Sequence, residues 1–452
     1  MVPDSIISRQ GRIVGLKAAL IIGLGLLFLL PLDMVRSVIV ERSERAREVA
    51  REIAGKWAHD QSIRGPFLIM PLERRDTDGG SRAMQGRRVV LLPDEFSAEA
   101  TVDTQRRARG IFESVVYTTQ ISLRGAFTTT ALARAGFDEE SWRPRVDQAV
   151  LALGISDLRG LQGDISLTWN EVPGFAAEPG MPGGNLAASG VHWPLKAVTA
   201  QGSNSFDLTL TLRGSSRFSF VPVGKDSDLV LRGDWPDPSF DGRTLPIEHE
   251  VGEEGFSARW EISHLSRPLP QSWTSEDAAG IDWSRLSVGA SFLEPVNFYL
   301  LSERSVKYGL LFVALLFLTF FLFELLAGIA LHPLQYLMVG AGLVLFFLSL
   351  VAFSEVLGFT AAYGLSSALV AAMVSLYAAA ILKRRLWAML LCAMIVSLYA
   401  LLFLILNLEE AALLGGTLLL FAALGLTMYV TRNVDWSNSL RSMTEAAKKE
   451  AP

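Results

Sequence analysis

The stretch Leu310-Leu-Phe-Val-Ala-Leu-Leu-Phe-Leu-Thr-Phe-Phe-Leu-Phe323 decides the fold class, because it carries no charged residue. A helix needs roughly 20 mainly apolar residues to cross the hydrocarbon core of a bilayer. The apolar run around this stretch is long enough, and similar runs follow and precede it. The sequence predicts six spans, at residues 16–38, 308–327, 334–353, 357–382, 386–406 and 411–431. We therefore expect a polytopic α-helical membrane protein with a 1+5 arrangement of transmembrane helices.

A long segment between the first and second spans has the composition of a soluble domain. The whole chain is 50% hydrophobic and only 19% charged, whereas soluble domains carry roughly 25% charged residues. Most of the charges lie between residues 41 and 304. The predicted organisation is a basic N-terminus (1–15), a first transmembrane helix (16–38), a large domain outside the membrane (39–305), a five-helix transmembrane block (306–431) and a tail (432–452).

The charges around the spans predict the orientation of the chain. The first span has a basic front but no small-residue cleavage site behind it, which favours an uncleaved anchor over a signal peptide. Basic residues gather in the N-terminal segment, in the loop Lys383–Arg385 and in the tail, while the opposite loops carry only acids. Positively charged loops stay in the cytoplasm. We expect both termini to be cytoplasmic and the large domain to lie across the membrane.

The large domain is predicted to begin with a helix and continue with strands. Apolar residues at helical spacing, including Ile39, Val49 and Trp57, extend the first span as a stalk helix up to Gly55. Alternation of apolar and polar residues then indicates sheets with one buried face. The predicted strands are 67–72, 89–92, 96–102, 115–123, 150–155, 165–169, 206–212, 217–221, 229–231, 256–262 and 286–292, with irregular loops at 73–88, 174–190 and 235–240. This pattern favours a β-rich, antiparallel, sandwich-like domain.

No catalytic or ligand-binding motif is present in the sequence. The five histidines are scattered without zinc-type spacing, and no glycine-rich phosphate loop occurs. Carboxylate pairs such as Asp226 with Asp228, or Glu253 with Glu254, are expected to be solvated turn residues. We predict no cofactor, no metal and no enzymatic activity. The formal net charge is −5 and no basic stripe carries aromatics, so nucleic-acid binding is disfavoured.

Four residues of the membrane block are candidate functional residues. The span centres hold no ionisable group, which matters because a charge at the bilayer centre costs roughly 2.5–3.5 kcal/mol. Glu324 lies near the end of the second span, with His332 and Tyr336 just beyond it, and Glu355 lies at the outer end of the third. Glu324 and His332 are placed to pair at the interface or to contact a lipid headgroup. The alternative is a snorkelling side chain or a purely structural hydrogen bond.

Small residues recur at every fourth position of the fourth span. They are Ser367, Ala371, Ser375 and Ala379. Such a stripe lets two helices approach closely. It indicates either packing against a neighbouring helix of the same chain or association of two copies into a homo-oligomer.

Several segments taken together resemble the CreD family, and the resemblance covers most of the chain. These segments are Glu48–Trp57, Arg109–Glu113 with Val116-Tyr117 after it, Gly154–Gly160, Trp235–Phe240, Gly255–Trp260, Val306–Phe312, Phe320–Glu324 and His332–Tyr336. Phe112 and Val356 depart from the family, where a tyrosine and a histidine are expected. The resemblance implies an inner-membrane protein of Gram-negative bacteria, produced under the CreBC two-component system and linked to envelope stress, including responses to colicin and β-lactams. It implies no catalytic residues.

Three functions remain open at this level. The first is a non-catalytic protein of cell-envelope integrity and stress response, whose periplasmic domain binds an unknown envelope protein or a lipid. The second is a transporter or lipid flippase, which would need a lateral groove lined by Glu324, His332 or Tyr336. The third is a periplasmic enzyme whose residues meet only in the folded domain.

Overall fold

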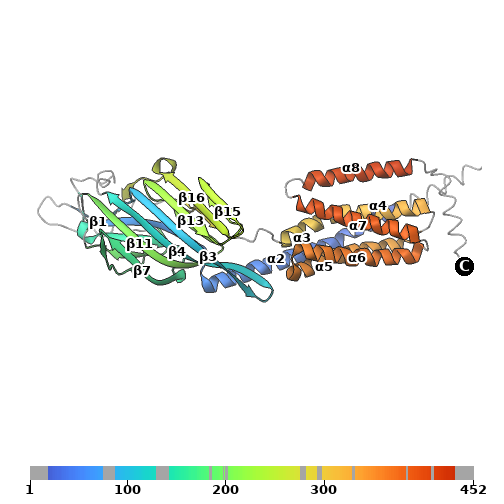
Figure 1. Ribbon diagram of the computed structural model, residues 1–452, viewed down its shortest axis with the longest axis horizontal. Coiled ribbons are helices and arrows are strands. Elements are labelled where there is room, and N and C mark those ends of the chain that lie inside the picture. The colour runs from blue at the N-terminus through green and yellow to red at the C-terminus, as the bar shows by residue number, and fades with distance from the viewer. Residues whose placement is uncertain are drawn as a thin grey trace, which may run out of the picture. The chain divides into compact units, whose positions relative to one another are not determined.

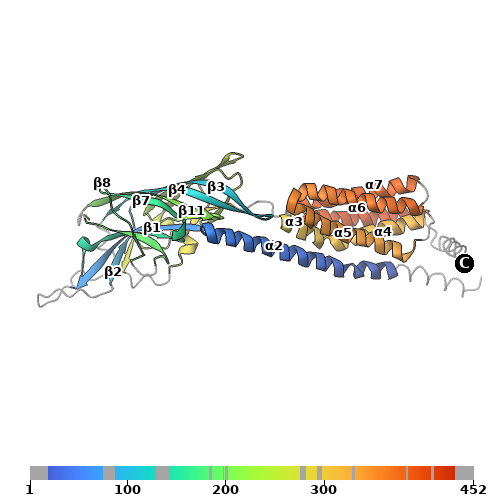
Figure 2. The same cartoon turned by 90° about the horizontal axis from the view of Figure 1, so that it is seen from below.

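The computed structural model describes residues 19–74, 87–128, 142–182, 186–196, 198, 202–274, 281–292, 298–327, 331–382, 385–408 and 412–432. The chain forms two compact units (Figures 1 and 2). One unit combines Met1–Arg45 with Val296–Pro452, and the other is Ala46–Pro295. The first contains the apolar helices and the second contains the strands, so we call them the helical unit and the β unit.

The helical unit confirms a membrane protein with several spanning helices. Its helices are α2 (Leu29–Trp57, which ends in the β unit), α3 (Phe298–Lys307), α4 (Gly309–Ala327), α5 (Pro333–Leu357), α6 (Phe359–Leu382), α7 (Arg385–Asn407) and α8 (Ala412–Thr431). Within the described residues four helices are long and apolar enough to cross a membrane: Ala19–Trp57, Pro333–Leu357, Phe359–Ala380 and Met389–Asn407. The bent pair α3 and α4 would make a fifth. The count of six spans therefore stays a prediction, because α8 yields only the shorter apolar helix Leu413–Tyr429.

Helix α3 is not among the predicted elements. It is bent by 49° from α4. Its buried residues, Tyr299, Ser302, Ser305 and Val306, follow a helical spacing and form one face. Three of these four residues carry hydroxyl groups, so hydropathy alone did not mark the segment as a helix with a buried face.

Helix α2 runs two residues beyond Gly55 and ends at Trp57. The Trp57 ring lies between two guanidinium groups, 4.8 Å from that of Arg107 and 4.3 Å from that of Arg213. Its indole Nε1 donates a hydrogen bond of 3.2 Å to the carbonyl of Tyr117. The end of the predicted stalk helix is therefore packed on the sheet that carries these residues.

Two sheets make up the β unit. The eight-stranded sheet has the order β15-β16-β13-β3-β4-β11-β7-β8. Its strands are β3 (Glu95–Arg109), β4 (Phe112–Thr128), β7 (Leu161–Trp169), β8 (Val172–Pro173), β11 (Ser203–Ser215), β13 (Asp226–Gly233), β15 (Glu248–Gly252) and β16 (Gly255–Ser263). The ten-stranded sheet has the path β14-β18-β12-β1-β6-β10-β9, with β2, β5 and β17 attached at its side. Its strands are β1 (Gln61–Arg74), β2 (Arg88–Leu91), β5 (Trp142–Pro144), β6 (Val150–Ile155), β9 (Glu178–Pro179), β10 (Gly190–Pro194), β12 (Arg217–Val221), β14 (Ser239–Gly242), β17 (Ser272–Thr274) and β18 (Val288–Ser291).

The two sheets share one core, as a sandwich requires. Tyr117 of β4 packs edge-on against Phe218 of β12, with ring centroids 6.2 Å apart. Its hydroxyl donates a 2.6 Å hydrogen bond to the carbonyl of Arg217. Most strand pairs are antiparallel, but β1 pairs with β12 and β3 with β13 in parallel. The expected β-rich domain with antiparallel sheets is confirmed, and the two parallel pairs were not predicted, because alternation has period two in either direction.

Most predicted strands are present, and the exceptions are local. Residues 286–292 form only the four-residue β18, because Trp283–Leu286 is a 3-10 turn. The two prolines before Ser239 had suggested that residues 235–240 are irregular. Ser239 and Phe240 instead begin β14. The tip of the predicted first hairpin, residues 75–86, lies outside the described residues. Short strands such as β5, β8, β9, β14, β15 and β17 were not predicted, since two to five residues carry too little periodicity.

A half-buried carboxylate, Asp157, joins the chain after α2 to the strands, and it predicts how stability depends on pH. Asp157 accepts hydrogen bonds from Arg159 Nη2 at 2.7 Å and from the backbone amide of His59 at 3.0 Å. The side chain of Arg159 holds the pKa of Asp157 well below its usual range, and the backbone amides of His59 and Arg159 add to this effect. This stabilisation is complete above the unfolded pKa of ~3.9 and is lost as the pH falls toward the lower folded pKa.

We therefore expect Asp157→Asn to lower the free energy of unfolding at pH 7 by about 1–2 kcal/mol, the scale of a lost cap. The difference from the parent should shrink as the pH is lowered below the unfolded pKa. Thermal unfolding of the detergent-solubilised chain over a pH series measures it. The exposed Asp164, changed to Asn, is the matched control. A difference that is the same at every pH would contradict the assignment.

Candidate functional site

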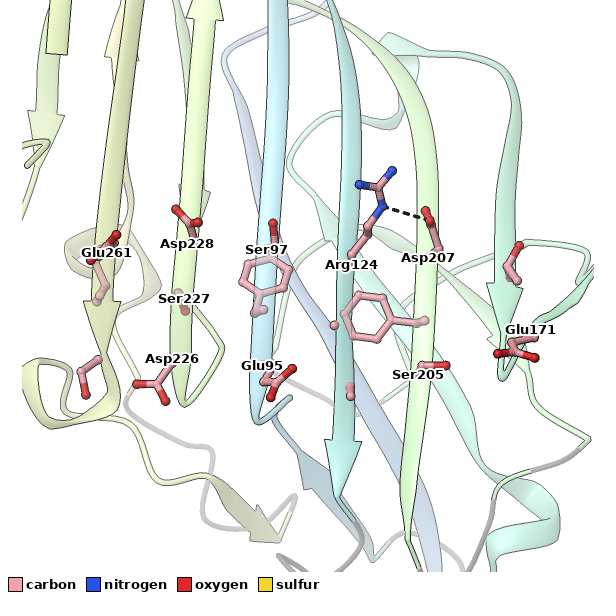
Figure 3. Close-up of a pocket in the computed structure, with 17 residues that line it drawn as sticks. Glu95, Ser97, Arg124, Glu171, Ser205, Asp207, Asp226, Ser227, Asp228 and Glu261 are labelled. Atoms are coloured by element: carbon pink, nitrogen blue, oxygen red, sulfur yellow. Dashed lines mark hydrogen bonds and ion pairs between the residues drawn. The ribbon is translucent and has the colours of Figure 1, made fainter. Parts of the chain in front are cut away.

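A groove of about 1050 Å³ opens on the face of the eight-stranded sheet that points away from the shared core (Figure 3). Polar residues on this face alternate with buried ones such as Phe96, Phe206 and Leu229. Six carboxylates line the groove: Glu95, Glu171, Asp207, Asp226, Asp228 and Glu261. Among the described residues that line it, one is a cation, Arg124. We call this feature the acidic groove.

Strand register aligns the groove side chains in two rows across the sheet. The first row runs through Asp207, Arg124, Ser97, Asp228 and Glu261, which are successive register partners on β11, β4, β3, β13 and β16. Figure 3 shows these side chains side by side above the strands. Residues far apart in the sequence thus meet on one face.

Two arginines neutralise part of the first row. Arg124 Nε lies 3.0 Å from Asp207 Oδ2. Arg259, which stands outside the groove lining, donates to both Asp228 oxygens at 2.9 and 3.0 Å and contacts Glu261 Oε1 at 2.9 Å. These exposed pairs each stabilise the fold only slightly, and they leave the groove acidic.

The second row is less balanced. It runs through Ser205, Ala126, Glu95, Asp226 and Ser263 in the same strand order. Glu95 and Asp226 are therefore directly opposite each other on adjacent strands, an arrangement of like charges that destabilises a sheet. The small side chains at the two ends of the row, Ser205, Ala126 and Ser263, leave room above the strands. The groove combines open space with uncompensated negative charge.

The sequence analysis missed the acidic groove. Asp226 and Asp228 were expected in a solvated turn, but both lie on β13. Glu253 and Glu254 do occupy the turn between β15 and β16, as expected. The difference arises because the groove depends on the register of six strands, which alternation does not specify. No residue of this sheet was a predicted site residue.

In the helical unit, the structure brings together two of the four candidate residues. The Tyr336 hydroxyl of α5 donates a 2.9 Å hydrogen bond to Glu324 Oε2 of α4. Glu324 is 2% exposed and Tyr336 is 1% exposed. The Tyr336 ring packs edge-on against Phe317, with centroids 5.6 Å apart. The carboxylate is thus bonded to a phenol inside an aromatic environment.

His332 does not pair with Glu324, which corrects one of the two expectations for it. Its Nδ1 accepts a 3.2 Å hydrogen bond from the amide of Leu334, and Gln335 Oε1 accepts one of 2.9 Å from the amide of His332. This reciprocal pair caps the start of α5, with Pro333 in the first helical turn. Free amides at a helix start require such acceptors. His332 serves as one of them, so its Nδ1 bonds the backbone of α5 and not Glu324.

Glu355 accepts three hydrogen bonds from residues on two other helices of the helical unit. Arg42 of α2 donates from Nε to Oε1 at 2.7 Å and from Nη2 to Oε2 at 2.5 Å. The Tyr299 hydroxyl of α3 donates to the same Oε1 at 3.0 Å. The Glu355 side chain is only 9% exposed. We call these three residues the Glu355 cluster; Arg42 and Tyr299 were not predicted, because their partners are far away in the sequence.

A second groove, of about 460 Å³, lies between α6 and α7. Thr360, Tyr363, Gly364, Ser367, Ala368, Ala371, Val396, Tyr399, Ala400 and Phe403 line it. It holds none of the residues that the transporter hypothesis required, and two members of the predicted small-residue stripe face it. Among the described residues no group of three His, Cys, Asp or Glu side chains could hold a metal ion.

The buried pair of Glu324 and Tyr336 yields a stability prediction. We expect Tyr336→Phe to lower the free energy of unfolding by about 0.5–2 kcal/mol, because the carboxylate loses a donor in an apolar environment. Thermal unfolding in detergent micelles measures the effect. Tyr377→Phe removes the hydroxyl of a tyrosine that is 38% exposed and serves as the control. Equal losses in the two variants would show that the hydrogen bond contributes nothing specific.

Comparison with known proteins places the chain in a family. The family model described as "Inner membrane protein CreD" matches residues 13–437. The inner membrane protein CreD of Escherichia coli (strain K12) is 32% identical over 426 residues, which cover 93% of each chain. Both matches extend over the helical unit and the β unit. The chain belongs to the CreD family of inner membrane proteins.

Proposed function

We propose that this protein is a non-catalytic component of the cell envelope whose β unit stands in the periplasm and binds a basic segment of an envelope protein. The acidic groove is the observation that carries the proposal. The helical unit would anchor the protein with six spans, keep both termini in the cytoplasm and present the β unit to its partner. A role in envelope integrity and stress response would follow from that binding.

The charge of the groove selects the class of partner. Six carboxylates line it, and two arginines partly compensate them: Arg124 pairs with Asp207, and Arg259 pairs with Asp228 and Glu261. Anionic phospholipid headgroups and nucleic acid would be repelled, whereas Lys and Arg side chains would find carboxylates on both sides. Complementary charge of this kind provides specificity and speeds association. A cationic protein segment therefore fits the groove better than a lipid does.

The dimensions of the groove favour an extended segment. Its lining residues come from six adjacent strands, β16, β13, β3, β4, β11 and β7. Five spacings of ~4.8 Å give a length of ~24 Å, which corresponds to about seven residues of extended chain.

Labelling of single cysteines tests the orientation. Cys392→Ser gives a cysteine-free chain, because Cys392 is the only cysteine. Ser205→Cys in the β unit should react with a membrane-impermeant maleimide in intact spheroplasts, and Ser439→Cys in the tail should react only after lysis. The reverse pattern would refute a periplasmic β unit.

Peptide binding tests the groove itself. We expect labelled heptalysine to bind the detergent-solubilised protein at low ionic strength and to dissociate at high ionic strength, since salt screens exposed charges. Glu95→Gln with Asp226→Asn should weaken binding at least about tenfold, a loss of ~1.4 kcal/mol. The control, Glu253→Gln with Glu254→Gln, removes the same charge from a turn.

Equal weakening by the two double variants would mean that heptalysine senses only net charge, and the groove would lose its role. If heptaglutamate bound as well as heptalysine, the charge argument would fail. The same variants can then be used as baits on solubilised native envelopes. A basic partner that is captured by the control but not by the groove variant would identify the natural ligand.

A further inference from the structure

We propose that α3 is a hinged arm of the helical unit, held bent by the Glu355 cluster, which straightens onto α4 when that cluster is released. The inference goes beyond the proposed function, because it concerns a conformational switch among the membrane helices. Its physical basis is a hinge with little internal resistance, a small set of polar bonds that hold the arm, and a buried face that is poorly satisfied.

The hinge lies at Tyr308 and Gly309, where α3 meets α4 at 49°. The backbone ladder is interrupted at the bend: Tyr308 N donates to Arg304 O at 3.3 Å before it and Phe312 N donates to Tyr308 O at 3.0 Å after it, and among these described residues no amide of α4 donates to a carbonyl of α3. Straightening would therefore complete one helix without breaking a loop structure. Gly309 also allows close packing at this point, because a Cβ there would lie 3.1 Å from a methyl of Leu32.

Polar bonds hold α3 in its bent position. The Tyr299 hydroxyl donates to Glu355, and Arg36 of α2 donates to Glu303 of α3 at 3.4 Å. Glu355 also binds Arg42 of α2 through two hydrogen bonds. One carboxylate thus joins α2, α3 and α5. Removing it would release α3 from α5, whereas the bond between Arg36 and Glu303 would still join α3 to α2.

The buried face of α3 opposes this arrangement. Ser302 is fully buried, and its hydroxyl has no partner within the described part of the chain. The Ser354 hydroxyl of α5, next to Glu355 in sequence, is also buried without a partner. A buried hydroxyl without a hydrogen bond is costly. These two unbonded hydroxyls lower the stability of the bent state, and the Glu355 cluster offsets their cost.

Helix α3 follows directly after the boundary between the two units in the sequence. The chain passes from the β unit to the helical unit at Pro295 and Val296, and α3 begins at Phe298. Along the chain, α3 is therefore the first described element of the helical unit after the β unit. Two-state elements of this kind convert small shifts into discrete rearrangements.

Spin-label distances test the hinge in the full chain reconstituted in nanodiscs. In a Cys392→Ser background, labels at Leu300→Cys of α3 and Leu345→Cys of α5 occupy positions that are 48% and 50% exposed. The arm from Phe298 to Lys307 has 10 residues, or ~15 Å of helix. A rotation of 49° moves its start by ~12 Å at that length.

In the parent we expect one narrow distribution of distances between the labels at positions 300 and 345. In the double variant Glu355→Gln with Tyr299→Phe we expect a second population, displaced by about 10 Å, which is the scale of that rotation. The control pair, Leu345→Cys with Leu369→Cys of α6, should keep its distribution in the same variant. An unchanged α3 distance would overturn the proposal. Broadening of both pairs would also overturn it, because the cluster would then support the whole bundle rather than one arm.

Discussion

The absence of water in the hydrocarbon core is the constraint on which the helical unit depends. Backbone groups there must be satisfied within each helix, and any ionisable side chain needs a partner close by. Glu324 meets this requirement with Tyr336, and Glu355 meets it with Arg42 and Tyr299. Both carboxylates stand near the ends of helices rather than at their centres. The same constraint explains why both are bonded to other helices, so that the polar residues of this unit also define its packing.

The sequence predicts those parts of the fold that depend on composition and local periodicity. Apolar runs located the long helices within a few residues, and alternation located most strands of the β unit. It could not supply α3, whose buried face is mostly hydroxylic, or the parallel pairs β1/β12 and β3/β13. Register is a long-range property, because it is fixed by which strands meet rather than by which residues follow one another. The acidic groove also depends on register, so the sequence alone did not predict it.

For the candidate residues, the sequence identified the residues themselves but not their partners. Composition singled out Glu324, His332, Tyr336 and Glu355 as polar residues in an apolar part of the chain. It could not assign partners, and so His332 was matched to Glu324 when the start of α5 required it as a cap. Arg42 lies 313 positions from Glu355. Its charge alone made it one of many basic residues on an exposed helix, and only the folded chain distinguishes it.

Carboxylates contribute to this molecule in two physically different ways. In the acidic groove they are exposed and screened, and each one has little effect alone. Their joint field across six strands would attract a cationic segment. In the Glu355 cluster a single carboxylate is largely removed from water and holds three helices at short distances, so its loss has a local structural effect. A ligand at the groove acts through many weak interactions, whereas a rearrangement of the membrane helices depends on a few strong ones. A single substitution would therefore affect the Glu355 cluster far more than it would affect the groove.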